Sequence, residues 1–419
     1  MPLPPPLDGL HDTSVTFINR VYPPVPGATG ELLRQLAEEL AATGTRVTVV
    51  TSRPSDDLPE HEMSRGVRVE RVAGIPFHRS GHLRRAVSYL SLFPAMAIRA
   101  LGGPRPDVII TMSDPPLLSV MGVVMSRLLG ASSMHWAQDV YPQLAAELGV
   151  INREGITYRT LNRISSWALA RHDKVICVGR CMEERLRKNG ARALAVVPNW
   201  PAPEVHPVAG KNNAFLSREG LSGSRVVMYS GNFGLAHDFS TIIDAAERLR
   251  DSRPDIQFLC VGEGPKKSWV ADQVRDRKLV NMRLMPFQSR QNLSSSLGAA
   301  DIHLATMEPN LSGLVVPSKV YGVLAAGRPC IFLGPEDSEV ARLISEKNCG
   351  RVLPRPSGSR LATTIEQLLE DGPALRKMGS RAIEAVAGSG ASVAARQFHT
   401  ILSEIPFRKL PNFRSKTSN

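Results

Sequence analysis

The sequence predicts an α/β fold made of two Rossmann-like domains. Its 419 residues exceed what one ordinary hydrophobic core accommodates. In the first half, apolar runs typical of buried strands alternate with amphipathic helical segments. The alternation begins again after a stretch rich in Pro, Gly and polar residues. We therefore expect an N-terminal domain at 1–198, a linker at 199–224, a second domain at 225–390, and a C-terminal helix with a basic tail at 391–419.

The first predicted domain opens with a βαβ unit. Residues 15–18 and 46–51 are the first two strands, and a helix at 31–43 connects them, with Leu32, Leu36 and Leu40 on one face. A right-handed crossover makes these strands parallel. Further strands are expected from apolar runs at 108–111, 133–137 and 174–178.

The second domain repeats this pattern. Strands are expected at 225–230, 256–261, 300–305 and 330–333, and a helix at 241–250. A loop after 305 runs into a helix that begins near Pro317, since Pro is preorganised for the first helical position. Ligands of such sheets bind at the carboxyl ends of the strands, so a cleft between the two domains is the expected site.

Charge and composition narrow the class of partner. Lys and Arg exceed Asp and Glu by 12, which favours anionic partners. Aromatic residues make up 5% of the chain, and none of its basic stretches is interleaved with aromatic side chains in the pattern that stacks on bases. Nucleotide phosphates or an anionic membrane surface are therefore favoured over nucleic acid.

The five cysteines are scattered, which indicates buried thiols in a reducing compartment. Cys177 and Cys181 have no second Cys/His pair to complete a metal site, and no cofactor motif is found. The N-terminal residues lack the pattern of a signal peptide, and no run is apolar enough for a spanning helix. The sequence thus predicts a cytoplasmic protein, either soluble or peripheral on the inner membrane face.

The helix expected after Pro317 is a candidate phosphate site. A loop containing Ser312, Gly313 and Leu314 leads to Ser318 and Lys319 in its first turn. Helix N-termini present unpaired N–H groups and partial positive charge, and a lysine there suits an anion. The alternative is an ordinary helix–strand unit without a ligand.

Several segments in order resemble the family-4 glycosyltransferases of the GT-B fold, and most closely the bacterial branch that builds surface polysaccharides. The resemblance spans nearly the whole chain. It rests on residues 27–30, 138–142, 197–200, 229–234, 261–265 and 317–329. It implies two Rossmann-like domains facing each other across a cleft, a nucleotide diphosphate sugar as donor, a glycan or polyprenyl-linked glycan as acceptor, and retention of anomeric configuration.

The sequence departs from the family at positions that hold the donor. Two family glutamates, which bind the donor sugar and ribose hydroxyls, fall at Leu314 and Gly322. The Arg and Lys that clamp the diphosphate fall at Asn232, which follows Gly231, and at His237. Lys319 and the backbone N–H groups of 312–318 are then expected to supply more of the phosphate electrostatics.

Asp139 is the candidate catalytic residue. It follows the strand at 133–137, where the resemblance implies a His or Asp facing the acceptor hydroxyl. A carboxylate there would orient the hydroxyl and take its proton. Two alternatives are that Asp139 caps the next helix, or that Asp114, after the strand at 108–111, is the functional carboxylate.

Three further features are assigned with their alternatives. Gly27 and Gly30 predict a loop on the acceptor side, or a simple tight turn. His237 is expected to donate to phosphate, although neighbouring Asp238 suits a helix cap. By family position Phe287 lies near the nucleotide base, with burial in the core as the alternative.

A basic segment at 78–99 carries Arg79, Arg84, Arg85 and Arg99 beside an apolar face. It is expected to lie on an anionic membrane, where polyprenyl-linked acceptors are found; a solvated helix face is the alternative. The sequence thus predicts a glycosyltransferase of cell-surface polysaccharide biosynthesis. The alternatives are a GT-B nucleotide-sugar 2-epimerase and a non-catalytic sugar-nucleotide-binding or scaffold protein.

Overall fold

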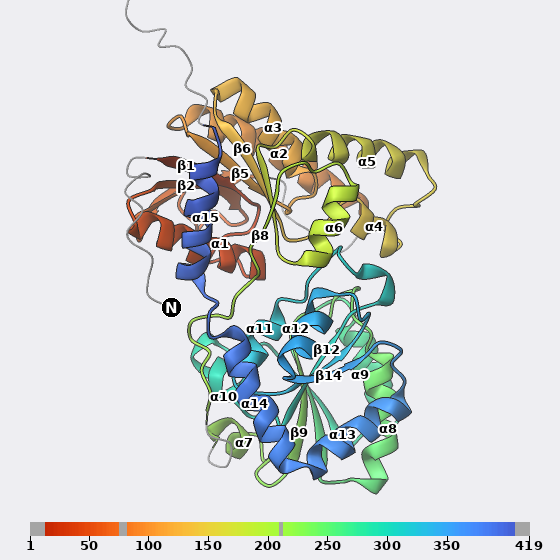
Figure 1. Cartoon of the computed structure of the whole chain (residues 1–419). Helices are drawn as coiled ribbons and strands as arrows, with labels where there is room; N and C mark the ends of the chain where they lie inside the picture. The colour runs from red at the N-terminus through yellow and green to blue at the C-terminus, as the bar shows by residue number, and fades with distance from the viewer. Residues whose placement is uncertain (1–12, 75–81, 209–212, 407–419) are drawn as a thin grey trace, which may run out of the picture. The chain divides into compact units, whose positions relative to one another are not determined.

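The structure, a computed structural model, describes residues 13–74, 82–208 and 213–406, and for 82–90 the backbone alone. The chain divides into two compact units, one formed by 1–198 with 391–419 and the other by 199–390. Each unit is a parallel or mostly parallel sheet with helices on both faces (Figure 1).

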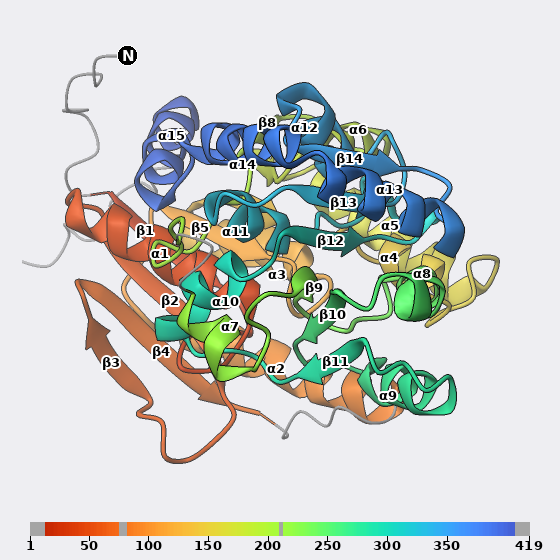
Figure 2. The ribbon, with the colours of Figure 1, turned by 90° about the horizontal axis from the view of Figure 1, so that it is seen from below.

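The first unit is built on an eight-stranded sheet in the order β3-β4-β2-β1-β5-β6-β7-β8, in which only β3 is antiparallel to its neighbour. Its strands are β1 Ser14–Ile18, β2 Arg46–Arg53, β3 His61–Ser64, β4 Val67–Ala73, β5 Val108–Met112, β6 Ser132–Ala137, β7 Lys174–Cys177 and β8 Leu194–Val196. Figure 2 shows β3 at the free edge of this sheet.

Helices cover both faces of this sheet. They are α1 Ala28–Ala42, α2 His82–Gly102, α3 Leu118–Leu129, α4 Gln143–Glu147, α5 Ile156–Leu169, α6 Arg180–Lys188 and α15 Ala391–Glu404. One core lies under α2 and α3, where Leu92, Met96 and Met121 pack on strand residues such as Ile109.

The C-terminal helix α15 belongs to the first unit, although the sequence analysis treated 391–419 as a separate segment. It packs on α1, and Nε2 of His399 lies 2.7 Å from Oγ1 of Thr43. Phe398 meets the ring of Trp136 edge to face, with 5.2 Å between the centroids.

The second unit has a six-stranded, fully parallel sheet in the order β11-β10-β9-β12-β13-β14. Its strands are β9 Arg225–Ser230, β10 Ile256–Val261, β11 Met282–Met285, β12 Ile302–Thr306, β13 Cys330–Leu333 and β14 Gly350–Leu353. Numbered within the unit, this is the order 3-2-1-4-5-6 of a Rossmann fold, whose crevice opens between the first and fourth strands. Here these strands are β9 and β12.

The helices of the second unit also form two layers (Figure 1). They are α7 Ala214–Arg218, α8 Ser240–Ser252, α9 Lys267–Asp276, α10 Leu293–Gly298, α11 Lys319–Ala325, α12 Glu339–Lys347, α13 Gly358–Glu370 and α14 Gly372–Val386, with 3-10 turns at Arg290–Asn292 and Pro309–Leu311. The stretch expected to be a linker contributes to this unit, because Phe215 of α7 and Leu221 are buried against β9 and β10.

Candidate functional site

The strongest cluster of predicted donor-side residues lies in the second unit, at the crevice between β9 and β12. The loop after β9 carries Gly231, Asn232 and His237. Nδ1 of His237 donates to the carbonyl oxygen of Thr306, the last residue of β12, at 2.7 Å. This bond ties the loop to the fourth strand of the unit, where Rossmann folds bind their ligands.

Gly231 allows the loop to pass close to Lys319. Its φ is 152°, in the region that favours glycine. A Cβ atom at this position would lie 3.0 Å from Cε of Lys319. Any side chain at position 231 would therefore make a close steric contact with the Lys319 side chain, which would have to shift.

Lys319 is the first residue of α11, so it lies in the first turn as the sequence analysis expected, although the helix begins two residues after Pro317. Its ammonium group contacts the side chains of Tyr229 and His237. Nζ lies 4.0 Å from the centroid of the Tyr229 ring and donates to the Tyr229 hydroxyl. The hydroxyl in turn donates to the carbonyl oxygen of Asn232 at 2.6 Å. Nζ also lies 3.3 Å from Nε2 of His237. No carboxylate pairs with this ammonium among the described residues.

The protonation states follow from these surroundings. Burial lowers the pKa of the Lys319 ammonium to about 7. Burial, with the nearby charge of Lys319, lowers the pKa of His237 to about 3. His237 is therefore neutral at pH 7, with Nδ1 protonated and Nε2 free to accept from Lys319.

The carboxylates around this cluster are engaged elsewhere. Glu263 accepts from Nζ of Lys267 at 2.6 Å, and Glu308 lies 3.6 Å from Nζ of Lys266. Lys266 also donates to the carbonyl oxygen of His237 at 2.6 Å. Of the three lysines Lys266, Lys267 and Lys319, Lys319 is thus the one that no carboxylate of the described residues pairs with.

The other donor-side candidates have different environments. Asn232 is exposed, and Phe287 is 55% exposed on the loop after β11, which rules out burial in the core. The Leu314 side chain is 1% exposed, and its N–H group donates to Leu311 at 3.0 Å. Gly313 has a φ of 72°.

Ser312 and Ser318 are half-buried, and Ser318 is the N-cap residue of α11. Asp238 immediately precedes Phe239, the N-cap residue of α8, which has no side-chain cap. Its carboxylate accepts from the Ser240 N–H group at 2.9 Å and from the Thr241 hydroxyl at 2.6 Å, so it binds the first turn of α8 without being its N-cap.

In the first unit, Asp139 follows β6 and lies beside a cavity of about 20 Å³, whose walls include Ser113, Leu117 and His135. That volume has room for about one water molecule. Leu117 has a φ of 70°, an uncommon conformation for leucine. The capping alternative for Asp139 is wrong: α4 starts at Gln143, and its N-cap residue is Pro142, with no side-chain cap.

Asp114 is held by an arginine. Nε and Nη2 of Arg20, which follows β1, donate to its two carboxylate oxygens at 2.8 and 2.7 Å. Asp139 has no such partner among the described residues. Burial and the neighbouring charge of Asp114 raise the pKa of Asp139 to about 7. Of the two carboxylates, Asp139 is therefore the one poised to exchange a proton near neutral pH.

Gly27 and Gly30 are placed where α1 begins. A Cβ atom on Gly30 would lie 2.8 Å from the carbonyl oxygen of Val21, and one on Gly27 would lie 2.7 Å from Cγ1 of Val21. These glycines let the helix start pack against Val21, so the loop has a structural need for them. A role toward an acceptor stays a prediction.

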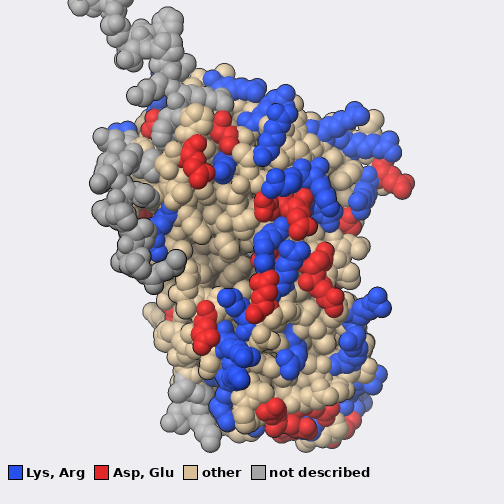
Figure 3. Space-filling view, viewed as in Figure 1, with Lys and Arg blue, Asp and Glu red and all other residues tan. Residues whose placement is uncertain are grey.

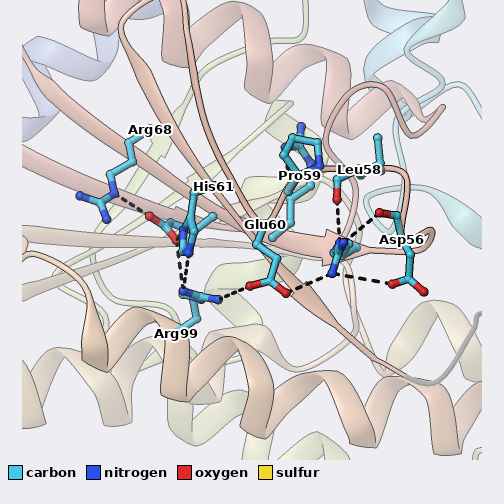
Figure 4. Close-up of polar contacts among 10 residues, drawn as sticks. Asp56, Leu58, Pro59, Glu60, His61, Arg68 and Arg99 are labelled. Carbon is cyan, nitrogen blue, oxygen red and sulfur yellow. Dashed lines mark hydrogen bonds and ion pairs between the residues drawn. The ribbon is translucent and has the colours of Figure 1, made fainter.

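A second group of charged residues lies between the β3–β4 edge and α2 (Figure 4). Buried Glu70 accepts from Nε of Arg68 at 2.5 Å and lies 2.6 Å from Nδ1 of His61, while Arg99 of α2 lies within 4 Å of both Glu60 and Glu70. A cavity of about 390 Å³ adjoins this group. Because these charges pair with one another, the group holds α2 against the sheet and presents no unpaired cation.

Sequence reasoning missed three residues of these sites. Tyr229 was named only as part of a strand and of the segment 229–234, with no role at the site. Its hydroxyl contact with Lys319 joins positions 90 residues apart. Arg20 and Lys266 were not singled out. No group of three or more His, Cys, Asp or Glu side chains in the described part of the chain is placed to hold a metal ion. All five cysteines are buried thiols, as expected.

Two family models match the chain, one over most of each unit. A model described as Glycosyl transferase 4-like domain matches residues 27–200. A model described as Glycosyl transferases group 1 matches residues 214–385.

Similar proteins carry names that agree with these models. The glycosyltransferase WbjE of Pseudomonas aeruginosa is 27% identical over 64% of this chain and 67% of its own length. WcaI of Escherichia coli, named as a glycosyl transferase of colanic acid biosynthesis, is 27% identical over 77% of this chain and 83% of its own.

Solved structures share the fold at low identity. Sucrose-phosphate synthase from Thermosynechococcus elongatus superposes with a TM-score of 0.74 at 17% identity, over 94% of this chain and 98% of that one. Anabaena HepE in complex with UDP-glucose superposes with a TM-score of 0.72 at 15% identity, over 94% of this chain and 100% of that one. Among the described residues, none of the helices has the length and apolar character needed to span a membrane.

Proposed function

Because the chain belongs to the glycosyltransferase family whose models match both of its units, and has the GT-B fold, we propose that it moves a sugar from a nucleotide diphosphate sugar to a lipid-linked glycan. The names of WbjE and WcaI support surface polysaccharide biosynthesis as the setting. Neither name supports the alternatives of an epimerase or a scaffold protein.

The observation that carries this proposal is the enclosed Lys319 ammonium. It lies at the Rossmann crevice of the second unit and has no carboxylate partner among the described residues. A buried cation without a counter-ion is unfavourable, and the diphosphate of a donor would supply the missing charge. The complex of HepE with UDP-glucose supports such a donor for this fold.

The chemistry follows from charge at the leaving group. As the bond between the sugar and the diphosphate breaks, negative charge grows on the leaving phosphate oxygen, and Lys319 stabilises it. Asp139 orients the acceptor hydroxyl and takes its proton. We propose retention of configuration by front-face attack, because no carboxylate of the described cluster around Lys319 is free to act as a covalent nucleophile.

A transfer assay tests this function. The purified chain is mixed with a panel of nucleotide diphosphate sugars, with and without a polyprenyl diphosphate-linked sugar as acceptor, and products are measured by mass spectrometry. We expect one donor to yield a nucleoside diphosphate and an acceptor heavier by one sugar residue. An isomerised donor without transfer would identify an epimerase, and binding without either product would identify a non-catalytic protein.

The Arg20–Asp114 pair provides a prediction about pH. Replacing Arg20 by glutamine leaves the Asp114 charge uncompensated beside Asp139, so the pKa of Asp139 should rise further. The rising limb of turnover against pH should move up by about one unit. Asp114→Asn removes the repelling charge and should move the same limb down. Identical profiles in both variants would show that Asp139 does not set this limb.

A further inference from the structure

Two neighbouring helices of the first unit carry large apolar side chains in solvent. On α3, Val124 and Leu128 are exposed, Leu128 by 65%, and Arg127 lies on the same face. On α5, Ile156 is 81% exposed and Ile164 is also exposed. Scattered exposed apolar residues are ordinary, but these recur along the outward faces of two helices.

Arginines lie among these apolar side chains. Arg159 and Arg163 are exposed on α5, one helical turn apart, and Arg171 follows the helix. Figure 3 shows Lys and Arg side chains gathered over the part of the first unit where Figure 1 places α3 and α5.

Trp167 joins the two helices into one surface. The guanidinium of Arg171 lies 4.7 Å from the centroid of its ring, and that of Arg127 from α3 lies 5.9 Å from it. We call this surface the α3–α5 face. Its residues are Val124, Arg127, Leu128, Ile156, Arg159, Arg163, Ile164, Trp167 and Arg171.

The α3–α5 face is positive because the sequence around it lacks acids. Residues 115–138 and 155–172, which contain α3 and α5, include no Asp or Glu. A second copy of the chain docked symmetrically on this face would bring arginines against arginines, which is unfavourable. An anionic lipid bilayer offers both a negative surface for the arginines and an apolar interior for the exposed side chains.

We propose that the α3–α5 face docks the protein on anionic membrane. This proposal rests on the proposed function, because docking on a membrane would bring the enzyme to a lipid-linked acceptor. It assigns the membrane contact to a surface other than the 78–99 segment of the sequence analysis. Residues 78–81 lie outside the described residues, as do the side chains of 82–90, which include Arg84 and Arg85.

Sedimentation with vesicles tests the proposal on the full chain. Vesicles of mixed phosphatidylglycerol and phosphatidylcholine are compared with vesicles of phosphatidylcholine alone. We expect binding only to the anionic vesicles, decreasing as salt rises. Arg159→Glu with Arg163→Glu should weaken it at least about tenfold. Leu128→Ser with Ile156→Ser should also weaken it while leaving its salt dependence unchanged.

A matched control variant distinguishes an effect of the α3–α5 face from an effect of the total charge of the protein. Arg248 on α8 and Arg396 on α15 are exposed, and replacing both by glutamate changes the net charge by the same amount. This control should bind vesicles like wild type. Equal loss in the control, or loss only on replacing Arg79, Arg84 and Arg85 by glutamate, would overturn the proposal.

Measuring donor binding distinguishes a failure of the docking proposal from a failure of the proposed function. Affinity for a nucleotide diphosphate sugar, measured by calorimetry in the absence of vesicles, should be the same in every vesicle-binding variant. Lost docking with intact donor affinity supports the α3–α5 face. Vesicle binding that survives while no donor binds to wild type would count against the proposed function alone.

Discussion

Replacing Lys319 by alanine is expected to weaken binding of the nucleotide diphosphate sugar by about 10- to 100-fold, the usual effect of losing a hydrogen bond to a charged group. The reason is that Lys319 supplies a cation with no carboxylate partner among the described residues. The apo protein should melt at the same temperature or slightly higher, because the substitution also removes a charge that burial disfavours. Calorimetric titration and thermal unfolding of the same samples measure both effects.

Two control variants show whether the loss of affinity in Lys319→Ala comes from the missing ammonium group. Lys319→Met keeps an unbranched side chain beside Tyr229 and should lose affinity as much as alanine does. Lys267→Ala removes a lysine of the same unit that already pairs with Glu263, and should change affinity little. If Lys319→Ala bound the donor as tightly as wild type does, Lys319 would have only a structural role.

Asp139→Asn is expected to lower turnover by about 100-fold or more, which is typical of losing a general base. Donor affinity should stay close to wild type, because Asp139 serves the acceptor. Wild-type turnover should rise with pH around an apparent pKa near 7, since Asp139 must lose its proton to act. The variant should lack this limb. Normal turnover in Asp139→Asn would exclude a catalytic role.

The same substitution should stabilise the fold at alkaline pH. The pKa of Asp139 is raised from 3.8 to about 7 in the folded state, so above pH 7 the folded protein holds a charge that burial disfavours. Asparagine removes this cost, and we expect a gain of about 1–2 kcal/mol at pH 8 after allowing for partial solvent access. The gain should disappear at about pH 3, below the unfolded pKa of 3.8, where the aspartate is mostly neutral in both states. Urea unfolding at the two pH values measures it.

The sequence predicted the central strands of both sheets because they are short apolar runs with clear boundaries. It missed β3, a polar strand at the sheet edge, and β8, which has three residues. It also gave no strand at β4 or β14. The place of α15 also escaped prediction, since its contact between His399 and Thr43 joins residues 356 positions apart. Nothing in the local sequence of 391–404 specifies that partner.

Residues of the candidate site could be predicted where the local sequence alone indicates their role. Lys319 stood out because a cation in the first turn of a helix opposes the helix dipole. Tyr229 did not, because an aromatic residue in a strand is ordinary until its hydroxyl is seen to hold Lys319. The pairing of Arg20 with Asp114, which leaves Asp139 as the unpaired carboxylate of the two, likewise depends on contacts across 94 residues.

Proton uptake on donor binding tests the central claim most directly. With a pKa of about 7, most Lys319 side chains are neutral at pH 8 in the free protein. The negative charge of a bound diphosphate should raise this pKa, so that these side chains take up protons from the buffer. Titrating an intact nucleotide diphosphate sugar, which has no group of its own titrating near that pH, in buffers of different ionisation enthalpy measures the protons taken up. The account predicts uptake approaching one proton in wild type and none in Lys319→Met. Tight donor binding without proton uptake in wild type would contradict it.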